Sequence, residues 1–130
     1  MRKDLENKMN FLPLPVLMIG TYYKDGKVDV MSAAWGGIHD YGKIYISLSK
    51  HKTTDNLELK GAFTVGFATK NTEKISDYFG VVSGNDEDKI LKSGVHVIKS
   101  NFVDAPIIQE YPLTLECTVE SFKDGLKLKD

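Results

Sequence analysis

The stretch that decides the fold runs from Val30 to Asn56 and reads VMSAAWGGIHDYGKIYISLSKHKTTDN. Small residues from Ser32 to Gly37 surround Trp35, the only tryptophan of the chain. The segment 43–49 then alternates between apolar and polar residues, which predicts a strand. A turn rich in lysine and hydroxyl side chains follows and leads into a predicted helix start.

This order of features suits a ligand with one flat end and one phosphate end. Small side chains let a flat ring lie against the backbone, whereas a cation, hydroxyls and the N–H groups of a helix start suit a phosphate. The segment is therefore able to hold both ends of a mononucleotide cofactor such as FMN, with Lys52 and Thr54 best placed for the phosphate. Simpler interpretations stay open. The small-residue run is also typical of a tightly packed strand and turn around a core tryptophan, and the segment 47–54 of a solvated strand end with a helix cap.

Composition predicts one soluble domain over residues 1–130. The net charge is −1, from 17 basic and 18 acidic side chains, so neither nucleic acid nor an anionic membrane is an expected partner. The apolar stretch from Phe11 to Gly20 contains two prolines, is too short to cross a bilayer and lacks a signal-peptide cleavage site. The single cysteine, Cys117, cannot form an internal disulfide, and we expect a reducing cytoplasm.

The remaining pattern predicts a mainly β fold with short helices. Apolar or alternating runs indicate about six strands by pattern count, at 15–23, 28–34, 43–49, 63–68, 95–98 and 113–122. The first two flank an Asp-Gly turn and predict a hairpin. Capping residues predict helices that begin at Thr53 or Thr54, at Asn71 or Thr72, and at Asn85. Consecutive hairpins with short helices favour a small antiparallel β-barrel over a doubly wound sheet.

Neither a metal site nor a catalytic side chain is expected. His39, His51 and His96 are widely spaced and far from Cys117, so no metal-ligand spacing is present. We place His39 in a loop after the Trp-Gly-Gly turn. No Gly-x-Ser-x-Gly elbow occurs, and Cys117 falls on an apolar strand face. The segment 77–84 is either a helix end with a loop, or a lid or dimer contact.

An ordered series of motifs resembles a known family. In chain order they are a Pro-Val strand opening, an Asp-Gly hairpin, Met-Ser-Ala-Ala-Trp-Gly-Gly, Ile-Tyr-Ile-Ser-Leu-Ser, Thr-Thr-Asp-Asn-Leu, Asp-Tyr-Phe-Gly, Ser-Gly-Asn-Asp-Glu-Asp-Lys and Pro-Leu-Thr-Leu-Glu-Cys. From about Pro13 to Phe122 the chain resembles the flavin reductase-like, FMN-binding split-barrel proteins, in the branch of flavoredoxin and ferric reductase.

The resemblance implies a homodimeric split β-barrel of antiparallel, Greek-key-like strands, with FMN near the dimer interface. It places the FMN phosphate at Lys52 and Thr54, with Ser47, Ser49 and Thr53 nearby as hydroxyl donors. It places the isoalloxazine ring along Met31, Ser32, Ala33, Ala34 and Trp35. The region 77–80 is expected on the substrate side.

The implied activity is that of an FMN-dependent oxidoreductase. Electrons pass from NAD(P)H or a protein donor through bound FMN to a flavin, ferric or protein acceptor, and no side chain needs to act as acid or nucleophile. Two alternatives stay open. The chain is a non-catalytic flavin-binding electron carrier, or a dimeric interaction domain that has lost flavin.

Two departures from the family pattern carry expectations of their own. Asp29 stands where the family often has asparagine, and we expect its charge to disfavour the reduced, anionic ring. The family's chains normally continue well past this length, so the C-terminus looks shortened. Lys123-Asp124-Gly125 looks like a hairpin turn whose return strand has barely begun.

Overall fold

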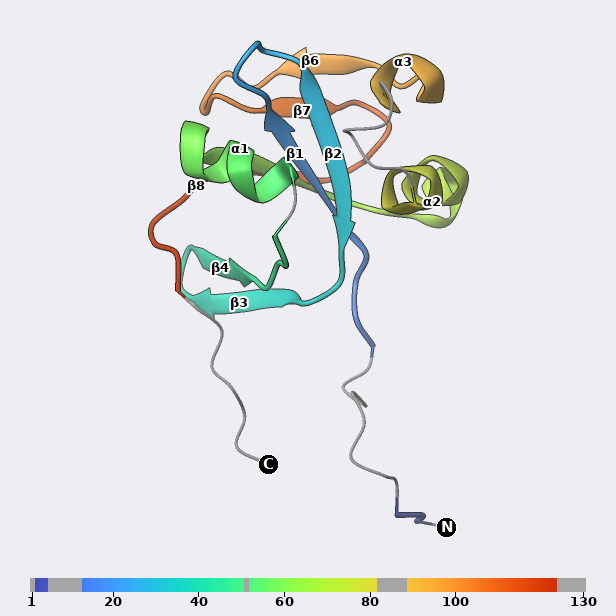
Figure 1. The fold of residues 1–130 in the computed structure, drawn as a ribbon. Coiled ribbons are helices and arrows are strands. Elements are labelled where there is room, and N and C mark those ends of the chain that lie inside the picture. Colours follow the sequence, from blue (N-terminus) through green and yellow to red (C-terminus); the bar gives the residue numbers. More distant parts are fainter. Residues whose placement is uncertain (1, 5–12, 51, 82–88, 124–130) are drawn as a thin grey trace.

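The computed structural model describes residues 2–4, 13–50, 52–81 and 89–123 (Figure 1). In chain order the elements are β1 (Leu17–Tyr22), β2 (Val28–Ala33), β3 (Gly36–Asp40), β4 (Lys43–Ile46), α1 (Lys52–Lys60), β5 (Ala62–Phe67), the 3₁₀ helix η1 (Lys70–Thr72), α2 (Glu73–Val81), α3 (Lys89–Ser93), β6 (Val97–Lys99), β7 (Pro106–Ile108) and β8 (Thr114–Thr118). This content confirms a mainly β fold with short helices.

One four-stranded antiparallel sheet, in the order β2-β1-β5-β8, forms the centre of the fold. The antiparallel pairs β3–β4 and β6–β7 form two smaller sheets. The β1–β2 hairpin is confirmed at its Asp-Gly turn, where the Tyr23 N–H donates to the Lys27 carbonyl at 2.8 Å. Gly26 has a φ of +84°, which glycine adopts without the penalty of a side chain.

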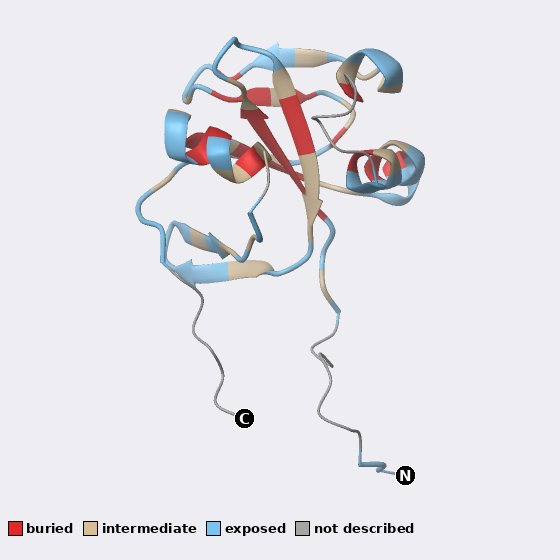
Figure 2. Ribbon diagram, in the orientation of Figure 1, coloured by how far each residue is buried: buried red, intermediate tan, exposed pale blue. Residues whose placement is uncertain are grey.

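Each face of the central sheet has its own core (Figures 1 and 2). Helices α2 and α3 and the β6–β7 pair cover one face, whereas α1 and the β3–β4 hairpin cover the other. The buried residues of the first core are Met18, Val30, Phe79, Ile108 and Tyr111. Those of the second core are Leu17, Ile19 and Val65. Alternation along β1 sends neighbouring side chains to opposite cores.

Two strands escaped prediction. β3 lies where a turn and a loop were expected, so His39 belongs to a strand and its loop assignment is wrong. Consecutive glycines are a strong turn signal, yet here Gly37 lies opposite Tyr45 in a regular antiparallel pair. β7 is only three residues long and begins with Pro106, which weakens any strand pattern. β4 and β8 are shorter than the predicted 43–49 and 113–122.

The helices were located correctly. α2 begins at Glu73, directly after the predicted cap Thr72, whereas the start of α1 differs from the prediction. α1 begins at Lys52, so Thr53 lies inside the helix and not at its cap. The helix ends at Gly61, which has a φ of +64° and whose N–H donates to the Leu57 carbonyl. The predicted cap Asn85, like the turn at 124–125, lies outside the described residues.

Candidate cofactor site

A cavity of about 370 Å³ opens where the end of β2 meets the segment that follows β4. Its lining consists of Met31, Ser32, Ala33, Ala34, Trp35, Ser47, Leu48 and Ser49. The Ser47 N–H donates to the Trp35 carbonyl at 2.7 Å and joins the two segments. The volume lies within the usual range of small-molecule sites. Of the lining, sequence reasoning missed only Leu48, which is one of the apolar residues of the alternating segment 43–49.

Close backbone packing brings these two segments together. Gly36 follows the cavity residues directly, and a Cβ on it would lie 2.9 Å from the Tyr45 carbonyl oxygen and 3.0 Å from Leu17 Cδ1. Only a residue without a side chain allows this approach. The small-residue run therefore has a packing role at Gly36 and leaves space beside the backbone at Ala33 and Ala34.

Helix α2 packs against β2 beside the cavity. A Cβ on Gly80 would lie 2.6 Å from Ser32 Oγ, so the end of α2 contacts the Ser32 side chain closely. Gly80 was expected on the substrate side, together with its neighbours from Asp77 onward. The structure places Gly80 behind Ser32, and the segment 77–80 is not among the cavity lining.

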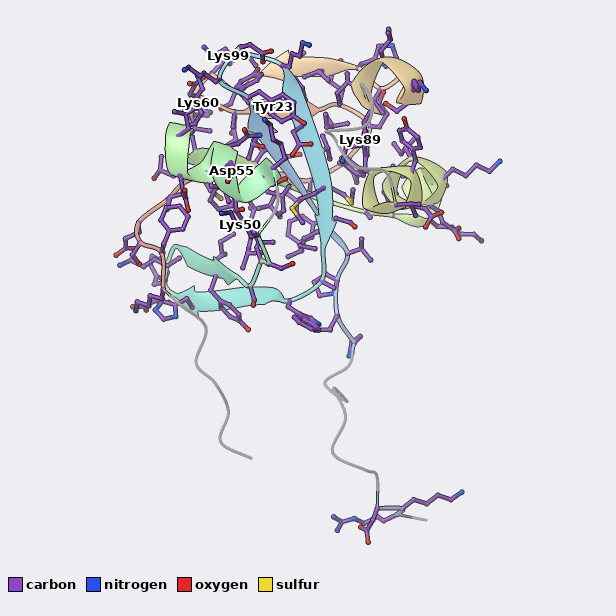
Figure 3. All side chains as sticks on the ribbon, in the orientation of Figure 1. Tyr23, Lys50, Asp55, Lys60, Lys89 and Lys99 are labelled. Atoms are coloured by element: carbon purple, nitrogen blue, oxygen red, sulfur yellow. The ribbon has the colours of Figure 1, made fainter. Side chains whose placement is uncertain are left out.

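Lys52 and Thr54 lie in the first turn of α1 and do not line the cavity itself. The first N–H groups of a helix have no intrahelical acceptor, and the helix dipole favours an anion there. The Lys52 ammonium lies 4.7 Å from the centroid of the Tyr23 ring, a cation–π distance. Figure 3 shows Lys50 on the segment that leads from β4 toward this helix start.

Thr53 has a different role from the one expected. Its side chain is 1% exposed, and its Oγ1 donates a 2.6 Å hydrogen bond to Asp29 Oδ2. A hydroxyl has one hydrogen to donate. The Thr53 hydroxyl therefore serves an internal contact, and the expectation that it donates to a phosphate does not fit the structure.

The expectation for Asp29 is also wrong. Its side chain is 3% exposed, does not line the cavity and lies 3.7 Å from the ammonium of Lys89. The Tyr23 hydroxyl donates to it at 3.3 Å. Burial lowers the pKa of Lys89, and the charge and hydrogen bonding of Asp29 oppose that shift. The carboxylate is thus compensated inside the fold and does not face a ring in the cavity.

No titratable side chain lines the cavity. Across the described part of the chain, no group of three or more His, Cys, Asp or Glu side chains is placed to hold a metal ion. Burial, and then the charge of Glu116, raise the pKa of the Cys117 thiol, which disfavours the reactive thiolate. None of the described helices is both long and apolar enough to cross a membrane.

Comparison with known proteins gives the class. The family described as "Flavin reductase like domain" matches residues 9–126. Flavoredoxin of Desulfovibrio vulgaris (Miyazaki F) is 33% identical, with a TM-score of 0.86 over 91% of this chain and 66% of that chain. No curated protein sequence matches significantly.

Two Shewanella structures agree with this class. An FMN-binding domain of a flavin reductases-like enzyme from Shewanella baltica is 26% identical, with a TM-score of 0.74 over 80% of this chain and 56% of that one. A flavin reductase with a split barrel domain from Shewanella frigidimarina is 14% identical, with a TM-score of 0.73 over 81% of this chain and 55% of that one. At this identity the likeness shows only that the two proteins share a fold. This chain belongs to the flavin reductase-like family and has the expected split-barrel fold. It spans two thirds or less of these relatives' lengths.

Proposed function

We propose that this protein is an FMN-binding oxidoreductase of the flavin reductase-like class. The observation that carries the proposal is the cavity between β2 and the segment after β4. This segment lines the cavity up to Ser49 and α1 begins three residues later, at Lys52. The residues present fit FMN. The cavity has apolar and small walls for the ring and serine hydroxyls along it, and Lys52, at the N-terminus of α1 outside the lining, suits the phosphate. Family membership and the FMN-binding relative support the same cofactor.

The chain's own residues bind and orient the cofactor. The backbone and small side chains from Met31 to Trp35 would hold the ring, and Ser47 and Ser49 would donate hydrogen bonds along the cavity. Lys52 and Thr54 would hold the phosphate at the start of α1. Bound FMN supplies the electron chemistry, which explains why the cavity needs no catalytic side chain.

The donor is NAD(P)H or a redox protein, and the acceptor is a flavin, a ferric complex or a protein. A cavity without any titratable lining residue fits a non-catalytic electron carrier equally well. Steady-state oxidation of NADH and NADPH, with free FMN as acceptor, separates the two functions. Turnover by the holoprotein supports the reductase, whereas a reducible flavin without turnover supports the carrier.

We further propose that the protein acts as a cytoplasmic homodimer that covers the open side of the cavity. Trp35, Ile38 and Tyr45 have exposed fractions of 53%, 85% and 53% and lie on or beside the β3–β4 hairpin next to the cavity. Large exposed apolar side chains beside a cavity are typical of surfaces that a protein partner covers. Light scattering of the purified protein measures the oligomeric state, and a monomer at high concentration contradicts the dimer.

The visible absorption spectrum of the purified protein, followed by titration with FMN, is the direct test of the cofactor. Flavin bands that elute with the protein, or saturable uptake of added FMN, are expected. A colourless protein that does not take up FMN contradicts the proposal and favours an interaction domain that has lost its flavin.

Removing the phosphate contacts should release FMN without unfolding the protein. The double variant Lys52→Ala/Thr54→Ala loses a charged and a neutral donor, and we expect the FMN dissociation constant to rise about 100-fold. Fluorescence quenching of FMN measures the affinity. Lys74→Ala, which removes an exposed lysine on α2, is the control and should leave the affinity unchanged. Equal FMN affinity of the double variant and the wild type would show that Lys52 and Thr54 do not bind the phosphate.

A further inference from the structure

Lys89, the first residue of α3, forms a nearly inaccessible ion pair with Asp29 of β2. Its Nζ lies 3.7 Å from Asp29 Oδ1, and the two side chains are 5% and 3% exposed. Burying two charges costs solvation, and a well-packed apolar pair in such a place is often at least as stable. Stability alone therefore does not explain this pair, and its other contacts identify a further role.

The Lys89 ammonium reaches the backbone of β2 just before the cavity. It donates to the Val30 carbonyl at 2.7 Å and to the Phe79 carbonyl at 3.4 Å. Figure 3 shows Lys89 beside β2 on the side of α2 and α3. β2 pairs with β1 and with no other described strand, so Lys89 contacts its open edge. Val30 directly precedes Met31, the first residue of the cavity lining.

Asp29 connects the same strand to the start of α1. Its Oδ2 accepts the Thr53 hydroxyl hydrogen at 2.6 Å, and its Oδ1 accepts from the Tyr23 hydroxyl at 3.3 Å. The Tyr23 ring in turn lies under the Lys52 ammonium at 4.7 Å. Two consecutive residues of the first turn of α1 are therefore tied to Asp29, one directly and one through Tyr23.

We infer that Asp29 and Lys89 are positioning residues that hold the ring end and the phosphate end of the cavity at a fixed separation. The inference rests on the proposed function, since it concerns the FMN site. Neither side chain lines the cavity, so both act through Val30 and Thr53. A ligand held at both ends binds tightly only when the spacing of the two ends is set before it arrives.

The link between Asp29 and the phosphate end can be cut with one isosteric substitution. Thr53→Val removes the donated hydrogen and keeps the shape of the side chain, whereas Thr53→Ser keeps the hydroxyl. Thr64→Val is the matched control, because Thr64 is also buried and its hydroxyl donates to the Pro106 carbonyl, on the other face of the sheet. FMN is titrated into each apoprotein, and thermal unfolding of each apoprotein reports the loss of stability.

We expect Thr53→Val to weaken FMN binding about tenfold, with Thr53→Ser and Thr64→Val within about threefold of wild type. Unchanged FMN affinity in Thr53→Val, or equal losses in Thr53→Val and Thr64→Val, overturns the inference and leaves the proposed function standing. A wild-type protein that takes up no FMN is instead the failure of the proposed function.

The link between Lys89 and the ring end needs a second variant. Asp29→Asn/Lys89→Met neutralises the pair, keeps an acceptor for Thr53 and removes the donor to Val30. We expect the visible circular dichroism of the bound flavin, which reports how the ring is held, to fall to about half its wild-type amplitude. A wild-type spectrum in this variant removes Lys89 from the positioning role, whatever the stability of the variant.

Discussion

Asp29→Ala is expected to lower the free energy of unfolding by about 3–5 kcal/mol, because it leaves a buried lysine without its counter-ion. Lys89 keeps its hydrogen bonds to the Val30 and Phe79 carbonyls but loses the only carboxylate in salt-bridge contact with it among the described residues. The buried Thr53 hydroxyl loses its acceptor in the same variant. Urea unfolding of the apoprotein, followed by far-ultraviolet circular dichroism, measures the loss.

Asp25→Ala is the matched control. Asp25 lies in the β1–β2 turn, four residues earlier, and its contact with Lys27 is 4.0 Å long with both side chains mostly exposed. Exposed ion pairs contribute little, and Asp25 Oδ1 also accepts one exposed hydrogen bond from the Lys27 N–H at 3.1 Å, so we expect a loss of about 1 kcal/mol or less. The double variant Asp29→Asn/Lys89→Met, which neutralises the pair and keeps an acceptor for Thr53, should recover most of the stability lost in Asp29→Ala. Equal effects of the two aspartate variants would mean that Asp29 is solvated in solution.

The loss in Asp29→Ala should also shrink as the pH rises. Burial lowers the pKa of Lys89, and removal of Asp29 deletes the charge that opposes this shift. Between the lowered pKa of the folded state and the ordinary lysine pKa of the unfolded state, the unfolded chain binds more protons. The free energy of unfolding therefore increases with pH between these two pKa values. The interval is wider in Asp29→Ala, because the pKa of Lys89 in the folded state is lowered further once Asp29 is gone. The difference between the wild type and Asp29→Ala should be smaller at alkaline pH than at pH 7.

Local patterns sufficed for the β1–β2 hairpin and for most of the cavity lining. The β1–β2 hairpin follows from two apolar runs and an Asp-Gly turn, all within the seventeen positions from Leu17 to Ala33. The cavity lining was predictable because the small-residue run and the serines after β4 are typical of a ring and a phosphate site. In both cases the residues that interact are close in sequence, and their types restrict the backbone directly.

The Asp29–Lys89 pair was not predictable in this way. The two residues are 60 positions apart in the sequence (89 − 29), and Lys89 follows Asp86, Glu87 and Asp88, a composition typical of a solvated helix start. Alternation along β2 placed Asp29 on one face but did not say what covers that face. The packing of α1 and α3 decides it, and that packing depends on contacts distant in sequence.

Gly20→Ala should be nearly as damaging as the loss of Asp29. A Cβ on this residue of β1 would lie 2.6 Å from Thr64 Oγ1 and 3.0 Å from the Pro106 carbonyl oxygen. These two groups are hydrogen-bonded to each other, so the added methyl group must separate them or push β7 away from the sheet. Overpacking and a lost buried hydrogen bond together should cost about 2–4 kcal/mol. Urea unfolding measures this loss as well.

Gly37→Ala is the control for Gly20→Ala. It shows the effect of replacing a strand glycine with alanine where the added Cβ meets no neighbour closer than ordinary contact. At Gly37 the nearest atoms to an added Cβ belong to the Tyr45 ring, at 3.4–3.7 Å, which is ordinary contact. Because glycine weakens a strand through its backbone entropy, the change there should stay within about 0.5 kcal/mol and favour alanine if anything. If Gly20→Ala were as mild as this control, β7 would not pack on β1 as closely as the structure has it. A large loss at Gly20 alone would show that the glycine is required because β7 crosses the sheet there.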